Sequence, residues 1–273
     1  MATKKIVSAG PAGPGDKGST GKTTFTPTPE AKGKATTYRL IAAGAWIVAI
    51  GLELFAIFWL LKHTELKGFM VWLIAVLVVI AVCALAGSLL WKKANRLDPA
   101  SEKNKLRFFV QNQLGAIITI LAFVPLIILI FVNPNMTKNQ KALAGVVGIV
   151  LAAVVGYFGV DTHPPSVEQM DQQAAVAIAY TGQDQVYWVK GGSVYHLCAE
   201  YPAGTTIAPL SRGDASNDVI QGTVAQAVAQ GKERLSMYGF SECGLTEGQP
   251  QYGTVDNPEP VGTTAPVPTD TPS

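Results

Sequence analysis

The residues with the clearest chemical capacity lie in the C-terminal third of the chain. His196 and Cys198 stand in "VYHLC", and Cys243 follows in "FSECG". Imidazole and thiolate groups are ligands that zinc prefers, but strong zinc sites pair them as Cys-x-x-Cys or His-x-x-x-His. Here Tyr201 follows Cys198 by three positions and Phe240 precedes Cys243 by three, so neither pairing is complete. The three residues are weak metal candidates.

The segment around His196 also has a purely structural interpretation, which we favour. It is rich in β-branched and aromatic residues, as strands are. Alternation along a strand places His196 and Cys198 on one face and Tyr195 and Leu197 on the other. We therefore expect packing residues on a strand, with metal binding as the less favoured alternative.

Glu53 is the single charge within an apolar run at residues 40–61. An ionised carboxylate at the centre of a membrane helix costs about 3 kcal/mol, so the group should be protonated, paired or turned toward protein. Two roles stay open: a proton or ion pathway, and a hydrogen-bond anchor to another helix or subunit, which we favour. The polar run Gln111, Asn112 and Gln113 could supply a partner.

Small residues recur every four positions near residue 150, at Ala144, Gly148, Ala152 and Gly156. Such a stripe lets another helix approach closely. The alternative is that membrane helices tolerate small residues in general. With Glu53, these four residues are our predicted interaction residues.

Other cofactor signals fail on inspection. In "GDKGSTGKTT" a phosphate loop would require glycine where Asp16 stands. His63 and His163 flank the apolar runs rather than lying within them, which argues against haem ligation. The sequence thus predicts no cofactor, no nucleic-acid partner, no small-molecule substrate and no enzymatic activity.

Composition indicates that these residues are positioned by membrane helices. The chain has 48% hydrophobic and 15% charged residues, whereas soluble domains carry about 25% charged residues. Apolar runs at about 40–61, 69–91, 112–132 and 141–160 each approach the ~20 residues that cross a bilayer. We predict an all-α four-helix transmembrane bundle followed by a small α+β soluble module.

Basic residues predict the orientation. Seven Lys or Arg precede the first span and six lie between the second and third, against two in each remaining loop. Because cytoplasmic loops carry this excess, both termini are predicted to be cytoplasmic in a multi-pass protein of the cell membrane. A disulfide between Cys198 and Cys243 would suit the exterior, so this topology predicts reduced thiols.

The regions outside the spans differ in composition. Residues 1–37 and 248–273 are rich in Gly, Pro and Thr, and we expect disordered tails. Residues 161–247 form the predicted cytoplasmic module: a helix capped by Ser166, two strands joined by a two-residue hairpin at Gly191-Gly192, and a helix from Thr223 to Gly231.

Residues from about 38 to 245 resemble an actinobacterial family, most specifically in "GGSVYHLC" and "GTVAQAVAQGKERL". The family is the larger, four-span accessory subunit of the cytochrome bcc–aa3 respiratory supercomplex of corynebacteria and their relatives. The two blocks also look like a small bacterial module in which a cysteine stands where this chain has Tyr201. The resemblance implies a non-catalytic subunit, packed against the oxidase or its bcc partner and surrounded by lipid, without redox cofactors of its own.

These observations lead to one favoured function and two alternatives. We expect an accessory membrane subunit that helps assembly or stability through helix packing and its cytoplasmic module. The alternatives are a small transporter or channel that uses Glu53 as its proton or ion site, and a metal or thiol sensor that acts through His196 and Cys198.

Overall fold

The computed structural model describes residues 6–9, 25–199, 218–236, 238–256 and 258 of the chain. It divides into two compact units. One unit spans Gly33–Pro164, and the other combines the residues up to Lys32 with those from Pro165 onward. The sequence also predicts a loop at 208–219; its residues 208–217 and most of the predicted C-terminal tail lie outside the described residues.

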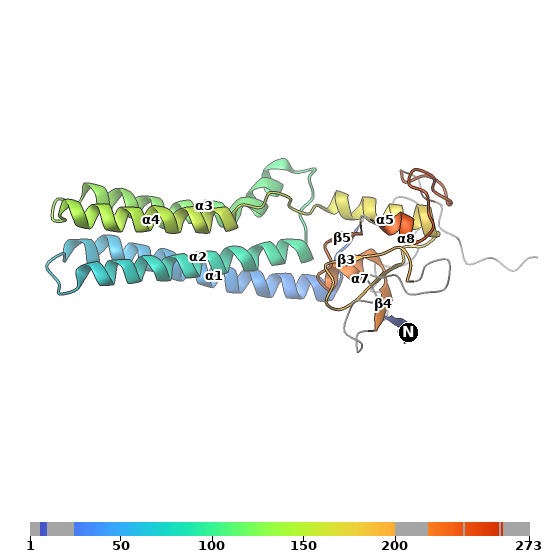
Figure 1. Cartoon of the computed structure of the whole chain (residues 1–273), viewed down its shortest axis with the longest axis horizontal. Helices are drawn as coiled ribbons and strands as arrows, with labels where there is room; N and C mark the ends of the chain where they lie inside the picture. The colour runs from blue at the N-terminus through green and yellow to red at the C-terminus, as the bar shows by residue number, and fades with distance from the viewer. Residues whose placement is uncertain (1–5, 10–24, 200–217, 237, 257, 259–273) are drawn as a thin grey trace, which may run out of the picture. The chain divides into compact units, whose positions relative to one another are not determined.

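The first unit consists of four long helices (Figure 1). They are α1 (Pro29–Phe58), continued by the 3-10 turn η1 (Leu60–Lys62), then α2 (Phe69–Leu97), α3 (Lys105–Val132) and α4 (Lys138–Gly159). All four are long and apolar enough to cross a membrane, as the sequence predicts. The chain is therefore a multi-pass membrane protein.

The outward surfaces of these helices are as apolar as their contacts. Ile47, Val71 and Ile120 expose 60% or more of their surface, and Tyr157 exposes 79%. In water such a surface would drive aggregation, whereas in a bilayer it faces acyl chains of matching polarity. The exposure of these apolar side chains is therefore explained only if lipid or another membrane protein covers them.

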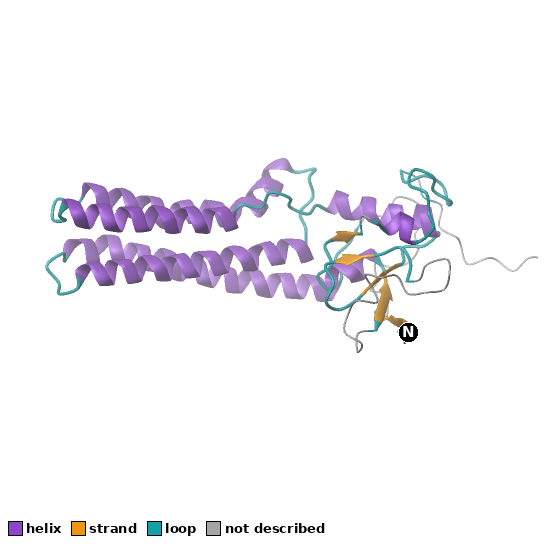
Figure 2. Cartoon of the chain, viewed as in Figure 1, coloured by secondary structure: helices purple, strands orange, loops and turns teal. Residues whose placement is uncertain are grey.

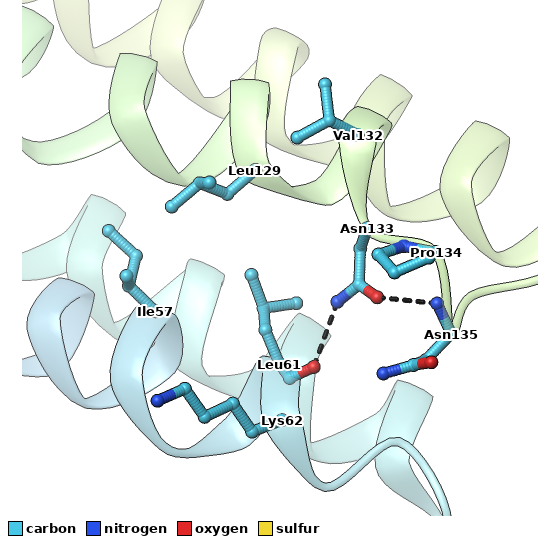
Figure 3. A pocket seen from close by; sticks show the side chains of 8 residues that line it. All are labelled: Ile57, Leu61, Lys62, Leu129, Val132, Asn133, Pro134 and Asn135. Atoms are coloured by element: carbon cyan, nitrogen blue, oxygen red, sulfur yellow. Dashed lines mark hydrogen bonds between the residues drawn. The ribbon is translucent and has the colours of Figure 1, made fainter.

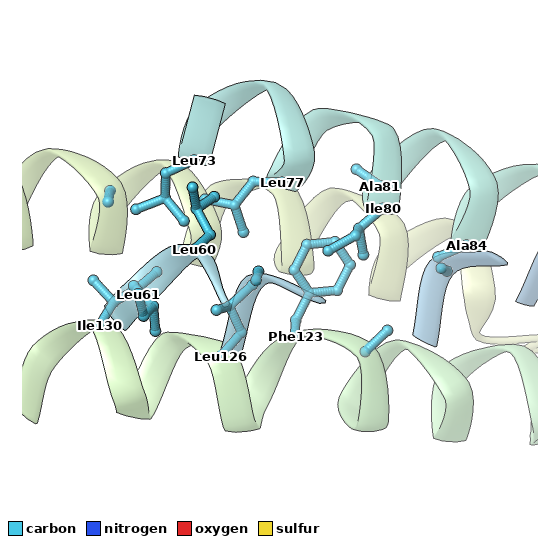
Figure 4. Close-up of a cluster of buried hydrophobic side chains, with 14 of the residues drawn as sticks. Leu60, Leu61, Leu73, Leu77, Ile80, Ala81, Ala84, Phe123, Leu126 and Ile130 are labelled. Carbon is cyan, nitrogen blue, oxygen red and sulfur yellow. The ribbon is translucent and has the colours of Figure 1, made fainter. Parts of the chain in front are cut away.

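The bundle core is built from side chains at helical spacing (Figure 4). Leu73, Leu77 and Ile80 of α2 meet Phe123 and Leu126 of α3, and all five are fully buried. The other labelled members of this cluster come from the end of α1 with η1 and from the neighbouring turns: Leu60, Leu61, Ala81, Ala84 and Ile130.

The helices extend beyond the predicted spans. α1 begins at Pro29, eleven residues before the apolar run at 40–61, where the sequence predicts a disordered tail. Proline suits the first turn of a helix, since its missing N–H has no partner there. Good helix formers such as Ala31, Lys32 and Lys34 continue the turn. The apolar run marks the stretch that crosses lipid, not the whole helix.

The second unit is a small α+β module (Figure 2). Its helices are α5 (Val167–Thr181), α7 (Val224–Ala229) and α8 (Gly239–Glu242), and its strands are β1 (Ile6–Ser8), β2 (Val186–Trp188), β3 (Val194–Tyr195), β4 (Val219–Gly222) and β5 (Arg234–Leu235). The predicted caps are confirmed: Ser166 accepts from the amide of Gln169, and Thr223 forms a capping box with Gln226. Gly231 stops the helix region with a φ of 81°.

The strands form two small sheets. The first has the order β1-β4-β2, with β1 parallel and β2 antiparallel to β4, and the second pairs β3 with β5 in parallel. The predicted two-residue hairpin at Gly191-Gly192 is wrong. Only Tyr187 and His196 pair between β2 and β3, and residues 189–193 form a longer turn. The turn is longer because Val189 leaves the strand and packs with Ala199 and Val219.

The N-terminal segment belongs to this module, in contrast to the predicted disordered tail. Ile6 of β1 is in register with Val219 of β4, and the amide of Ala9 donates to Gln221. Phe25 is buried in the module core with Trp188. Because β1 precedes the first span and β4 follows the last, their pairing requires both to lie on one side of the membrane. An even number of crossings satisfies this requirement.

Candidate functional site

His196 and Cys198 contact the same partner segment, although β3 ends at Tyr195 and the predicted strand does not continue through them. The Nδ1 atom of His196 lies 2.9 Å from Oε2 of Glu242, the last residue of α8. Cys198 is bonded to Cys243, the residue that caps α8. Two neighbouring side chains on each segment therefore make one polar and one covalent link. We call these four residues the His–Glu–disulfide cluster.

In the structure Cys198 and Cys243 form a disulfide, in contrast to the reduced thiols that the sequence predicts. The predicted topology places both cysteines, 45 positions apart, in the cytoplasm, and it is this topology rather than their spacing that argues against the bond. Within the described part of the chain, no group of three or more His, Cys, Asp or Glu side chains is arranged to hold a metal. The weak metal candidates His196, Cys198 and Cys243 are thus brought together, but as a histidine–carboxylate pair beside a disulfide.

Burial dominates the electrostatics of the cluster. His196 is only 2% exposed, and its loss of hydration lowers its pKa from the ordinary value of 6.5. The hydrogen bond and the negative charge of Glu242 raise the pKa in part, as a carboxylate does by favouring imidazolium. The neutral imidazole that burial favours donates through Nδ1 to Glu242 when its proton is on that nitrogen.

Lys232 organises the turn that precedes the cluster, a role the sequence did not suggest. Lys232 is 3% exposed as a residue, and its ammonium donates to the carbonyl of Val189 at 2.8 Å, to that of Lys190 at 3.1 Å and to that of Gly192. An ammonium has three donors, and all three are used. Burial lowers the pKa of Lys232, and the three carbonyl dipoles compensate the charge.

A second buried contact fixes the strand that carries His196. The Tyr195 hydroxyl donates to Oε1 of Gln173 on α5, and the same oxygen accepts from the amide of Leu235 at 2.9 Å. Burial raises the pKa of the Tyr195 phenol. One side chain of α5 therefore joins β3 and β5, and it holds the backbone beside the cluster in place.

Glu53 lies inside the bundle, 3% exposed, and its Oε1 atom has no hydrogen-bond partner among the described residues. The predicted partners are engaged elsewhere. The side chain of Gln111 donates to Asn95, that of Asn112 accepts from Asn95, and that of Gln113 donates to the carbonyl of Asp161. The prediction of a polar partner from this run is wrong, because Glu53 lies beside the backbone of Leu126, about four helical turns along α3 from Asn112.

The small-residue stripe of α4 packs inside the chain. A Cβ at Gly148 would lie 3.0 Å from Cγ1 of Ile127 on α3, and Ala144 is fully buried. Ala152 packs against the bundle core, and Gly156 faces Thr119. The stripe does allow close helix approach, as predicted, and the helices that approach are α2 and α3.

A polar cluster that sequence reasoning missed joins three helices near the loop between α2 and α3. Arg39 of α1 forms an ion pair with Asp98 at 2.7 Å and donates to the carbonyl of the same residue. Asn95 of α2 donates to the carbonyl of Gln111 and to the side chain of Asn112 on α3. This cluster connects α1 to α2 and α2 to α3 where hydrocarbon gives way to the interface.

The opposite end of the helices contains a pocket of about 340 Å³ (Figure 3). Ile57, Leu61, Leu129 and Val132 form its apolar walls, and Lys62, Asn133, Pro134 and Asn135 complete the lining. Asn133 donates to the carbonyl of Leu61 at 2.9 Å and accepts from the amide of Asn135 at 2.8 Å. Its amide group is therefore used to fasten the loop after α3 to the end of η1.

Comparisons with known proteins add no relative: no family model, no curated protein and no solved structure matches this chain.

Proposed function

We propose that this chain is a non-catalytic accessory subunit of a larger membrane complex, of the cytochrome bcc–aa3 type that its sequence resembles. The observation that carries the proposal is the way in which the reactive side chains of the module are used. His196 bonds Glu242, the two cysteines bond each other, and Lys232 bonds three carbonyls. Each of these groups holds the fold together, as expected of a scaffold.

The bundle supports the same role. Its small-residue stripe and its core side chains are used within the chain, which produces a self-sufficient bundle. Its outward residues, among them Ile47, Val71 and Trp72, are apolar and exposed. A partner in the membrane would pack against such a surface by van der Waals contact, the main source of helix association in lipid.

The proposed orientation has both termini in the cytoplasm. Thirteen Lys or Arg stand in the N-terminal tail and the loop between α2 and α3, against four in the other two loops. An excess of this size directs a segment to the cytoplasmic side. The pairing of β1 with β4 agrees with both ends lying on one side, whichever side that is.

Copurification tests the accessory role. The full chain is tagged at its C-terminus, membranes are solubilised in a mild detergent, and the proteins that coelute are identified. We expect larger membrane subunits together with a haem absorption spectrum, and neither from the untagged control strain. A protein that elutes alone, and that chemical crosslinking in intact membranes leaves as a single chain, would contradict the proposal.

A second function, a proton or ion carrier, is favoured by one observation. The Oε1 atom of Glu53 is buried without a partner among the described residues, and buried carboxyls within membranes frequently serve ion pathways. The variant Glu53→Gln, reconstituted in liposomes, separates the two functions. If it still copurifies with its partners but loses an ion flux that the wild type shows, the carrier function replaces the accessory one.

A further inference from the structure

The Cys198–Cys243 bond is the covalent link between two parts of the module that the His196–Glu242 contact also joins. Cys198 lies three residues after β3, and Cys243 caps α8, 45 positions later. Both cysteines are partly exposed, whereas the neighbouring His196 and Glu242 are buried. The disulfide thus lies at the edge of the module core rather than within it.

Whether this disulfide is stable depends on the redox chemistry of the compartment that contains it. The inference therefore rests on the orientation proposed above. Basic residues place the module in the cytoplasm. Thiol reductants there keep most cysteines reduced, and disulfides that do form are usually transient. We propose that Cys198 and Cys243 are a reversible thiol–disulfide couple, reduced by a cytosolic thiol and reoxidised by the corresponding small-molecule disulfide.

The exchange balances in two steps. The thiolate of one reductant molecule attacks one sulfur of the pair, which forms a mixed disulfide and releases the other cysteine as a thiolate that takes up a proton. A second reductant thiolate then attacks the reductant's own sulfur in the mixed disulfide. The products are two protein thiols and one oxidised reductant disulfide, with two electrons and two protons transferred to the protein.

The segment that responds is the one that follows α8. Its amides bond α5: those of Gln251 and Tyr252 donate to the carbonyl of Ala179, and that of Gly248 donates to the Tyr180 hydroxyl at 2.7 Å. Phe240 packs against the Tyr180 ring in a tilted arrangement, with centroids 4.6 Å apart and the planes at 51°. After reduction these noncovalent contacts and the His196–Glu242 bond hold the segment alone, without the covalent restraint, so it opens from α5 more often while the core stays folded.

Thiol trapping in cells tests the couple directly. Growing cells that express the full chain with Cys83→Ser, which removes the free cysteine, are quenched in acid and alkylated with a polyethylene-glycol maleimide. We expect two added groups in growing cells, none after treatment with diamide, and two again after the oxidant is removed. The variants Cys198→Ser and Cys243→Ser should each add one group in growing cells.

A structural readout accompanies the trapping. Hydrogen exchange of the purified full chain, with and without reduced glutathione, reports on the amides of Gly248, Gln251 and Tyr252. Reduction should accelerate the exchange of these amides by between about tenfold and about a thousandfold. The upper value is the full stabilisation that the chain-entropy model assigns to a disulfide closing a loop of this length. The amide of Gln169, at the capped start of α5, should exchange at an unchanged rate and serves as the internal control.

The outcomes also separate this proposal from the orientation on which it rests. A bond that stays oxidised in growing cells, while a reporter fused after Ser273 is active only in the cytoplasm, overturns the couple and leaves the orientation intact. A bond that stays oxidised with a reporter active only outside overturns both. Reduction that cannot be reversed by diamide or by oxidised glutathione also overturns the couple.

Discussion

Replacing Lys232 by methionine should destabilise the β2–β3 region specifically. Methionine keeps the length and the apolar stem of the side chain but removes the donors to the carbonyls of Val189, Lys190 and Gly192. A hydrogen bond from a charged donor contributes about 1.5–3 kcal/mol, and buried carbonyls left without a donor cost about 1–3 kcal/mol each. Some of these carbonyls lie in a turn where water can replace the ammonium, so we expect a total of about 3 kcal/mol.

Hydrogen exchange of the full chain in detergent measures this loss of stability at the β2–β3 region itself. The amides of Tyr187 and His196 donate to each other's carbonyls at 2.8 and 2.7 Å, so they report on the pairing that the Lys232 ammonium supports. A loss of about 3 kcal/mol corresponds to roughly a hundredfold faster exchange. The matched control is Lys190→Met, which removes an exposed ammonium from the same turn and should leave the rates unchanged. Equal rates in Lys232→Met and the wild type would refute the reasoning and show that the buried ammonium contributes no net stability.

Three further predictions concern the rest of the cluster and the bundle. Because burial lowers the pKa of His196 below 6.5, the unfolded chain binds more protons than the folded one between the two values. The module should therefore be most stable above pH 6.5 and lose stability as the pH falls through the folded pKa. Exchange rates corrected for the pH dependence of intrinsic exchange should show this loss, and the variant His196→Gln should not show it. Gly148→Val should lower the melting temperature in detergent, because overpacking costs about 1–3 kcal/mol. Gly51→Val is the control and should leave the melting temperature unchanged, since a Cβ there has nothing within 4 Å. Equal melting temperatures for the two variants would contradict the assigned packing. Glu53→Leu should raise the melting temperature, since it removes a buried carboxyl whose Oε1 has no partner among the described residues, and a large decrease would reveal a stabilising contact.

The spans could be predicted from the sequence because their signal is local. An apolar run of about 20 residues has few other physical solutions than a membrane helix. The same holds for the caps at Ser166 and Thr223, where the side chain bonds an amide three residues away. Each of these features depends on neighbours in the sequence.

The features that the sequence did not reveal depend on distant partners. β1 has three residues, and its partner strand begins more than 200 positions later, so no periodicity marks it. Lys232 looks like any surface lysine until three carbonyls converge on it. The disulfide was misjudged for a different reason: compartment chemistry gives the average state of a thiol, while the fold decides whether two thiols meet.

The pairing of β1 with β4 has a consequence for biogenesis. The ribosome releases Ile6 long before Val219, so β1 has no partner until the last helix has entered the bilayer. Phe25 likewise has no core to pack into until Trp188 has been synthesised. A nascent chain that failed to insert one helix would leave the two strands on opposite sides of the membrane, with the core of the module unfinished and open to proteases. The module can therefore complete its fold only after all the helices have inserted in the correct orientation.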